Sequence, residues 1–204
     1  HAAAELLSRD LPQDRREQFA DTIVTEAERL DVFASRLLQL AALEKRRDIE
    51  EHESFDLASL AEDVIEAHAL ECESRELKVA LNKRDCPPMH GDRFLIRQAI
   101  DNLLRNAIKF TESGSITVRT GKKQGFVVIE VEDTGIGIPE DIKNRIFDPF
   151  FTTKANGEGT GLGLAVCQWI VRNHQGWIEL AHSEPGKTVF RIRIPALTKD
   201  ANKE

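Results

Sequence analysis

The stretch that most constrains the fold is a helix predicted over 91–110. At about 100° per residue, its apolar residues form one stripe that must face a core: Ile96, Ile100, Leu103, Leu104 and Ala107. Asn102, Asn106 and Lys109 fall in a band about 60° wide, nearly opposite that stripe. Asparagine is a poor helix former, so two on one face beside a lysine suggest a function. Amide oxygens suit Mg²⁺ and lysine suits phosphate, although a solvated polar face would explain this helix equally well.

The elements predicted around this helix are those of an α+β sandwich. Hydrophobic periodicity predicts further helices at 57–70, 139–147 and 161–175. Strands are predicted at 55–57, 77–81, 115–120, 126–132, 177–181 and 188–194, with a hairpin around Gly121 and Gly125. Helices and antiparallel strands segregate in this order, which favours the α+β class.

A long helix is also predicted over 14–47, ahead of this domain. Its apolar residues recur three or four apart, and Ile23, Leu30 and Leu37 are spaced by seven, as in a helical hairpin. A simple surface helix packed on the domain is the alternative. The charged run 44–53 is typical of a linker. We therefore expect a partial hairpin and linker over 1–53, the main domain over 54–197 and a tail over 198–204.

Composition excludes several classes of function. The net charge of −7 argues against a nucleic-acid partner, because phosphate backbones require a basic surface. No apolar run approaches the ~20 residues that span a bilayer, and we expect no signal peptide. Cys72, Cys86 and Cys167 are odd in number and widely spaced, which favours buried thiols in a reducing compartment. The histidines are not spaced as metal ligands.

The motif DTGIGIP over 133–139 follows a predicted strand. Gly135 and Gly137 would let the backbone approach a flat ligand without interference from a Cβ atom. A buried Asp133 can accept a hydrogen bond from an exocyclic amino group, so the motif would prefer adenine to guanine. A strand-end turn would account for the first three residues about as well.

The motif GTGLGL over 159–164 opens the helix predicted at 161–175. Backbone amides at a helix N-terminus bind anions, and glycines let a phosphate come close. The spacing matches neither a Walker A loop nor a dinucleotide fingerprint.

The segment FDPFFTTK over 147–154 joins the two glycine motifs. Its aromatic residues could anchor a mobile lid from which Lys154 reaches bound phosphates, although an exposed lysine is the simpler interpretation.

Together these motifs resemble the boxes of the two-component sensor histidine kinases. NLLRNAIKF over 102–110 resembles the N box, and DTGIGIP resembles the G1 box. FDPFFTTK is similar to the F box, GTGLGLA to the G2 box, and GKTVF over 186–190 to the final box, where the family more often has a second glycine. All five occur in the family's order between about residues 54 and 195. The resemblance implies the Bergerat (GHKL ATPase) sandwich, with helices on one face of a mixed sheet and a lid at 148–160.

The resemblance also implies roles for individual residues. For the phosphate end, Asn106 would hold Mg²⁺ with Asn102 beside it, and Lys109 would touch phosphate. For the adenine end, Asp133 would accept from the amino group and Thr188 would support the base. The remaining residues implied to bind ATP are Phe110, Gly135, Gly137, Ile138, Lys154, Gly159, Thr160, Gly161, Leu162 and Gly163.

The family's phosphoacceptor, a histidine in the box His-Glu/Asp-x-x-x-Pro, has no match here. His1 is followed by Ala-Ala-Ala-Glu, and AAAELL resembles the segment downstream of that box in sensors of the CreC type. We therefore expect the acceptor upstream of this chain, which would carry the ATP site without its substrate. Residues 14–47 resemble the second helix of the dimerisation and phosphotransfer hairpin.

Three functions follow from these observations. The first is protein-histidine kinase activity, with transfer onward to an aspartate on a response-regulator receiver domain. The second is ATP hydrolysis of the gyrase, Hsp90 or MutL kind, but those proteins carry a glutamate base at the place of Asn102, and asparagine cannot accept a proton. The third is a nucleotide-sensing module without transfer. For the kinase we expect a homodimer in the full-length protein, and a cytoplasmic domain attached to an inner membrane only through N-terminal regions.

Overall fold

The computed structural model describes residues 53–153 and 160–196, together with Arg15 and Thr22. The chain divides into two compact units, 1–47 with 152–160, and 48–151 with 161–204. In the first unit, Arg15 and Thr22 are helical and exposed. The rest of the predicted hairpin lies outside the described residues.

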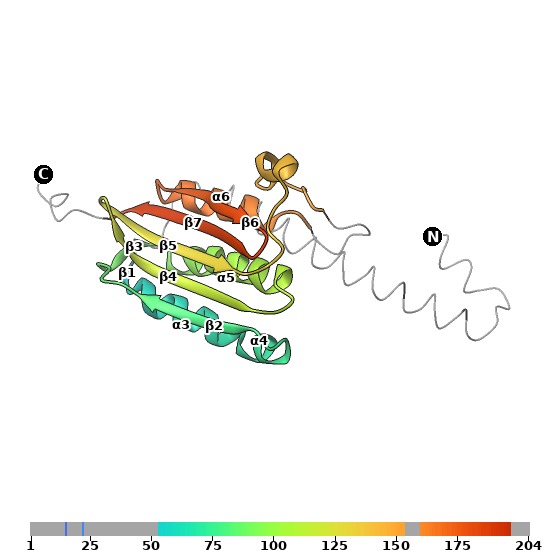
Figure 1. Ribbon diagram of the computed structural model, residues 1–204. Helices are drawn as coiled ribbons and strands as arrows, with labels where there is room; N and C mark the ends of the chain where they lie inside the picture. The colour runs from blue at the N-terminus through green and yellow to red at the C-terminus, as the bar shows by residue number, and fades with distance from the viewer. Residues whose placement is uncertain (1–14, 16–21, 23–52, 154–159, 197–204) are drawn as a thin grey trace, which may run out of the picture. The chain divides into compact units, whose positions relative to one another are not determined.

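A five-stranded mixed sheet is the centre of the second unit (Figure 1). The strand order is β2-β4-β5-β7-β6, and only the β2–β4 pair is parallel. The strands are β2 Lys78–Lys83, β4 Ser115–Lys123, β5 Phe126–Asp133, β6 Trp177–Glu184 and β7 Lys187–Pro195. Two short strands, β1 Glu53–Phe55 and β3 Met89–Gly91, form a separate antiparallel pair.

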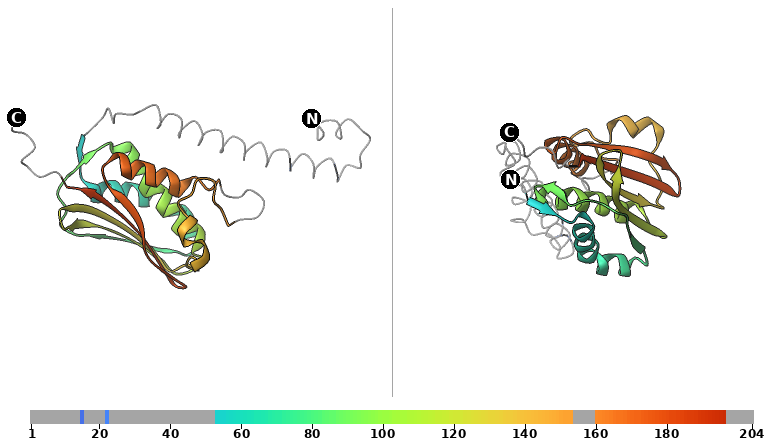
Figure 2. Two further views of the ribbon diagram at one scale, coloured as in Figure 1. Left: turned by 90° about the horizontal axis from the view of Figure 1, so that it is seen from above. Right: turned by 90° about the vertical axis from the view of Figure 1, so that its left-hand side faces the viewer.

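The helices α3, α5 and α6 lie on one face of this sheet (Figure 2). Their bounds, with those of α4 and the 3₁₀ helix η1, are α3 Leu57–Ala67, α4 Ala69–Ser74, α5 Arg93–Phe110, η1 Glu140–Arg145 and α6 Gly163–Asn173. The predicted α+β sandwich, with helices on one face of a mixed sheet, is therefore confirmed. None of the helices within the described ranges has an apolar stretch of the length that a bilayer requires.

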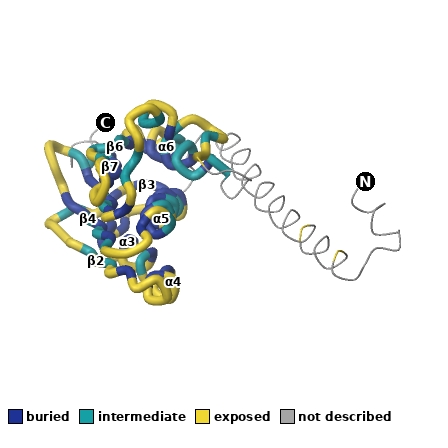
Figure 3. The backbone as a smooth tube through the Cα atoms, turned by 45° about the vertical axis from the view of Figure 1, so that its right-hand side comes forward, coloured by how far each residue is buried: buried dark blue, intermediate teal, exposed yellow. Residues whose placement is uncertain are grey.

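The core lies between α5 and the sheet (Figure 3). The predicted stripe of α5 is buried, with Ile96, Ile100 and Leu104 completely inaccessible to solvent. Burying one such side chain contributes about 1.5–3 kcal/mol, so this stripe is a main source of the domain's stability. On β5, buried Ile129 and Val131 alternate with half-buried Glu130 and Glu132, as expected for a sheet covered on one face.

Two helix boundaries differ from the prediction, and each has a local cause. The helix predicted over 57–70 is divided at His68, which ends α3 and precedes α4. The His68 imidazole lies 2.7 Å from the Asp101 carboxylate on α5, a distant contact that the periodicity does not reveal. Helix α5 begins at Arg93 and not at Gly91, because the Asp92 carboxylate caps it by accepting from the Leu95 N–H at 3.0 Å.

Other elements are shorter than predicted or were missed. The helix predicted over 139–147 is the 3₁₀ helix η1, and the helix predicted from 161 begins at Gly163. Leu57, predicted both to end a strand and to begin a helix, is the first residue of α3. Strand β3 was not predicted, because its three residues carry no periodic pattern of their own.

Candidate functional site

The loop that follows β5 makes two close backbone contacts that only glycine permits. Gly137 has φ of +76°, and a Cβ atom there would lie 2.7 Å from the carbonyl carbon of Glu184. A Cβ atom on Gly135 would collide with the Phe110 carbonyl oxygen. The two glycines of the DTGIGIP motif are therefore required by the fold itself, whatever they also do for a ligand.

Hydrogen bonds hold this loop between the end of α5 and the β6–β7 turn. The Gly186 N–H donates to the Gly135 carbonyl at 2.8 Å. Further along the loop, the Ile136 N–H donates to the Phe110 carbonyl at 3.4 Å, and the Ile138 N–H donates to the Ser183 hydroxyl at 2.7 Å. Three of the motifs identified in the sequence thus meet at one end of the sheet.

Asp133, the last residue of β5, is 5% exposed and surrounded by hydrogen-bond donors. Its Oδ1 accepts from the Gly135 N–H at 2.9 Å and from the Thr111 hydroxyl at 3.5 Å. Thr188 lies directly opposite on β7 and also donates to the carboxylate. Burial raises the pKa of Asp133 above its usual value, although these three donors oppose the shift. Asp133 and Thr188 are therefore brought together, as the motifs predicted.

The polar face of α5 meets the first turn of α6. Asn102, Asn106 and Lys109 are all half-buried, apart from the core stripe. The Asn102 Oδ1 atom lies 3.6 Å from the position that a Cβ atom on Gly163 would occupy. The Asn102 side chain also hydrogen-bonds the thiol of Cys167, one turn further along α6, whose pKa burial raises to about 12. A solvated polar face is therefore not a sufficient description of Asn102, because its side chain lies beside Gly163 and bonds to Cys167 of α6.

Gly161 holds the start of the F-box segment close to α6. It has φ of +63°, and a Cβ atom there would collide with the backbone of Phe150 and Phe151. The Phe150 N–H donates to the Gly161 carbonyl at 3.0 Å. The predicted aromatic anchor is supported by two ring contacts, Phe147 edge-on to Phe190 and Arg145 stacked 4.6 Å from the Phe151 ring centroid.

The remaining candidates differ in what their side chains could reach. Phe110 is 37% exposed, with the Lys109 Nζ atom 5.5 Å from its ring centroid. Leu162 is completely buried. Thr160 is half-buried and belongs to the first unit. Lys154 and Gly159 lie outside the described residues, together with the rest of the part of the expected lid over 154–159.

Two residues of this site were missed in the sequence. Thr111 ends α5 and donates to Asp133, and a polar residue directly after a helix that carries functional side chains is a signal that could have identified it. Cys167 lies four residues after Gly163 on the same face of α6, but its contact with Asn102 could not be inferred without the packing of α5 on α6.

A protein-family comparison decides what this arrangement is. Residues 91–198 match the family described as histidine kinase-, DNA gyrase B- and HSP90-like ATPases. The chain belongs to this ATPase family. The matched residues include α5, the DTGIGIP loop, the start of α6 and the β6–β7 pair, so the family comprises every element of the site described above. The domain is accordingly an ATP-binding domain.

The similar members of this ATPase family are sensor histidine kinases. The sensor-like histidine kinase SenX3 of Mycolicibacterium smegmatis is 32% identical over 201 residues, 95% of this chain and 52% of that protein. The sensor protein CreC of Escherichia coli is 33% identical over 195 residues, 94% of this chain and 41% of that protein. The chain thus spans about half the length of the curated relatives it matches.

Among solved structures, the histidine kinase ThkA is similar in two forms. Its nucleotide-free catalytic domain is 32% identical, with a TM-score of 0.63, over 71% of this chain and 97% of that chain. A structure of ThkA in complex with the response regulator protein TrrA is 26% identical, with a TM-score of 0.70, over 93% of this chain and 53% of that chain. The fold is that of a histidine kinase catalytic domain.

Proposed function

We propose that this chain is the catalytic core of a sensor histidine kinase that transfers the terminal phosphate of ATP to a histidine. The observation that carries the proposal is the position of the Asn102 amide next to Gly163, on the same helix face as a half-buried Asn106 and Lys109. This position brings the asparagines of α5, which could bind a metal ion, next to the glycine motif of α6, which could bind phosphate. The similarity to SenX3, CreC and ThkA supports the same assignment.

The adenine end of the site would be built on Asp133. Its buried carboxylate is an acceptor that matches the exocyclic amino group of adenine and opposes the carbonyl of guanine. Thr111 and Thr188 hold that carboxylate in place by hydrogen bonds. The residues that would line the base are Phe110, Gly135, Gly137 and Ile138.

The phosphate end would be built from α5 and the start of α6. Within the described residues, no group of three His, Cys, Asp or Glu side chains could hold a metal ion by itself. A Mg²⁺ ion here would therefore take the Asn106 amide oxygen and phosphate oxygens as ligands, with Asn102 beside it. When bound, the ion would neutralise charge on the transferring phosphate. Lys109 and the backbone of the glycine motif would hold the phosphates, and the residues we assign there are Lys154, Gly159, Thr160, Gly161, Leu162 and Gly163.

Transfer is favoured over hydrolysis by the chemistry of α5. Hydrolysis requires a base to activate water, and Asn102 cannot accept a proton. The neighbouring carboxylate, Asp101, lies 2.7 Å from His68 through Oδ1 and 2.8 Å from the Arg105 Nε atom through Oδ2. It is thus held by two partners on the side of α5 away from Asn106.

The partners proposed for the whole protein follow from the same relatives. The acceptor histidine would lie on a helical hairpin that precedes this domain, in a homodimer, and a response-regulator receiver domain would take the phosphate next. The complex of ThkA with TrrA supports this choice of partner class. We further propose a cytoplasmic domain, connected to an inner membrane only through regions N-terminal to it. That the whole protein is a sensor of the CreC type is also part of this proposal.

The test uses the protein extended upstream by its native sequence. Incubation with γ-labelled ATP and Mg²⁺ should give acid-labile, base-stable label on a histidine of the extension, and Asn106→Ala should remove that label. Release of inorganic phosphate without labelled protein would identify a hydrolysing ATPase. Nucleotide binding without either product would identify a nucleotide-sensing module.

A further inference from the structure

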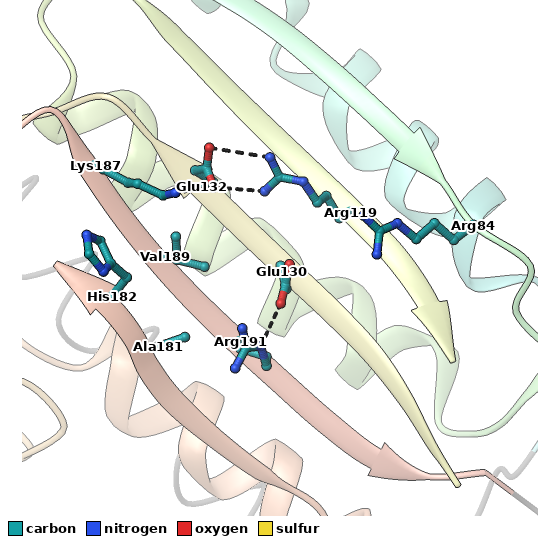
Figure 4. Close-up of a pocket in the computed structure, with 9 residues that line it drawn as sticks. All are labelled: Arg84, Arg119, Glu130, Glu132, Ala181, His182, Lys187, Val189 and Arg191. Atoms are coloured by element: carbon teal, nitrogen blue, oxygen red, sulfur yellow. Dashed lines mark hydrogen bonds and ion pairs between the residues drawn. The ribbon is translucent and has the colours of Figure 1, made fainter. Parts of the chain in front are cut away.

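The face of the sheet opposite α3, α5 and α6 carries a shallow charged pocket of about 360 Å³ (Figure 4). None of the described helices covers this face (Figure 2). Its lining combines four permanent cations, two carboxylates and a histidine with two small apolar side chains. These residues are Arg84, Arg119, Lys187, Arg191, Glu130, Glu132, His182, Ala181 and Val189.

The charge of this lining opposes that of the whole molecule. With His182 neutral, the four cations of the lining exceed its two carboxylates by two, and Glu179, outside the lining but 2.9 Å from an Arg191 terminal nitrogen, reduces this excess to one. The chain as a whole has a formal net charge of −7. A local excess of positive charge on an acidic protein attracts acidic partners selectively, because the remaining surface repels them.

The ion pairs within the pocket leave part of the positive charge uncompensated. Glu132 accepts from both terminal nitrogens of Arg119, at 2.9 and 3.3 Å, and Glu130 lies 2.6 Å from the Arg191 Nε atom. The Arg119 guanidinium holds the pKa of Glu132 below its usual value. Lys187 shares Glu132 with Arg119 in a longer ion pair of 3.8 Å, and Arg84 forms no ion pair with any described residue. Arg84 and Lys187 therefore provide the positive charge available to a partner.

An aromatic pair flanks this charged area on the same face. Phe126 and Trp177 meet edge to face, with ring centroids 4.8 Å apart. The Arg193 guanidinium lies 5.5 Å from the Trp177 ring centroid, and Trp177 is 38% exposed. Tryptophan and arginine are the residues that most often dominate the binding energy of protein interfaces.

The width of the positive area indicates the class of the partner. Its cations extend from the end of β2 across β4 to β7. Neighbouring strands lie about 4.8 Å apart, so the three intervals from β2 to β7 span roughly 14 Å. That distance is too large for one phosphate group, but it suits several carboxylates on a polypeptide. We propose that this open sheet face docks an acidic segment of a partner protein, independently of the ATP site.

The test measures binding of a fluorescent oligoglutamate peptide by anisotropy. The double variant Arg84→Glu/Lys187→Glu should bind roughly tenfold more weakly, and the affinity of the wild-type protein should fall steeply between about 0.05 and 0.3 M salt. Lys122→Glu is the matched control. It makes the charge change of either single substitution, on β4 but opposite the buried Val127 on the helix-covered face, and should change affinity by less than about twofold.

A second measurement locates the bound peptide. Titration should shift the NMR signal of the Trp177 indole N–H and leave that of Trp169, on α6, unchanged. Saturating ATP should not alter the peptide affinity, so failure of the ATP assignment would leave this result intact. Equal binding by the double variant, an unshifted Trp177, or tighter binding of inorganic triphosphate or phosphatidylserine vesicles than of the peptide would overturn the proposal.

Discussion

Asp133 and Glu132 are adjacent in the sequence, yet they lie on opposite faces of β5 and in opposite electrostatic environments. Asp133 faces the helices, where burial disfavours its charge and raises its pKa. Glu132 faces solvent beside Arg119, which lowers its pKa. Alternation along a strand is sufficient to predict that the two point in opposite directions. The donors Thr111 and Thr188 come from distant segments, since the sheet register brings Thr188 to Asp133 and the packing of α5 on the sheet brings Thr111 there.

We predict that Asp133→Asn raises thermal stability at neutral pH while weakening ATP binding at least roughly tenfold. A raised folded-state pKa favours the protonated form, so the contribution of Asp133 to stability is lost as pH rises through that pKa. The gain in stability should therefore shrink as pH falls toward the ordinary value of 3.8. Thermal unfolding followed across pH, with calorimetric titration of ATP, measures both effects.

Glu132→Gln is the comparison for this variant, because it should change stability at neutral pH in the opposite direction. The lowered pKa of Glu132 contributes stability above the ordinary value of 4.5, and that contribution is lost as pH falls through the folded-state pKa. Its removal should cost about 0.2–1 kcal/mol at neutral pH, since the pair with Arg119 is partly exposed. If Asp133→Asn and Glu132→Gln changed the stability at neutral pH by equal amounts in the same direction, this account of β5 would be contradicted.

Asn106→Ala tests the proposed magnesium ligand. We expect Mg²⁺-dependent ATP binding to fall below detection, because the amide oxygen is the ligand that α5 would offer the metal. The fold should persist, since Asn106 lies outside the buried stripe of α5 and its loss opens no cavity. Calorimetric titration is the measurement, and Arg105→Ala, which alters an exposed neighbour paired with Asp101, is the control. Unchanged affinity in a folded Asn106→Ala protein would remove the metal assignment.

At the scale of elements, the strongly periodic segments were predicted well and the short ones were not. Helix α5 and strands β4, β5 and β7 have enough residues for their apolar pattern to identify one face. Strand β3 and the 3₁₀ helix η1 are determined by their neighbours, so their own residues do not specify them. The site follows the same rule. Its motifs were readable one by one, but the contact of Asn102 with α6 depends on how two helices pack.

Gly137→Ala tests whether the loop after β5 is an element that the fold holds rigidly. The alanine would combine a strained positive φ with an overlap against Glu184, and should destabilise the domain by about 2–5 kcal/mol. Gly125→Ala is the control, because Gly125 has a similar φ of +82° but open space around it. Strain alone should cost that variant about 1–2 kcal/mol. Chemical denaturation of both proteins measures their unfolding free energies. Equal losses of stability would show that the loop moves to relieve the overlap with Glu184.

Within the described ranges, the histidines of the molecule all belong to the ATP-binding domain itself. His68 and His174 are buried, and His174 is held through both ring nitrogens, by the Ile170 carbonyl at 2.8 Å and the Asp92 N–H at 3.1 Å. His90 and His182 belong to strands of the ATP-binding domain. His1 and His52 lie outside the described residues.

We predict that this chain binds ATP yet does not phosphorylate itself. None of its histidines has both an acidic neighbour that could take the proton and the following proline of the H box. Incubation with γ-labelled ATP and Mg²⁺ should therefore leave the protein unlabelled, with an unrelated autophosphorylating kinase as the positive control. Acid-labile label that maps to His52, which lies between Glu51 and Glu53, would require a different assignment of the segment over 14–47.

The position of β7 in the sheet has a consequence for the synthesis of this protein on the ribosome. Residues 187–195 form an interior strand between β5 and β6, and β6 pairs with no other described strand. A nascent chain therefore carries an unpaired β6 and an unpaired edge of β5 until residue 195 has left the exit tunnel. Translation at about 5–20 residues per second makes this interval short. A product terminated before Lys187 would still contain α5 and the DTGIGIP loop, but not Thr188, so incomplete chains would lack part of the nucleotide site that we propose.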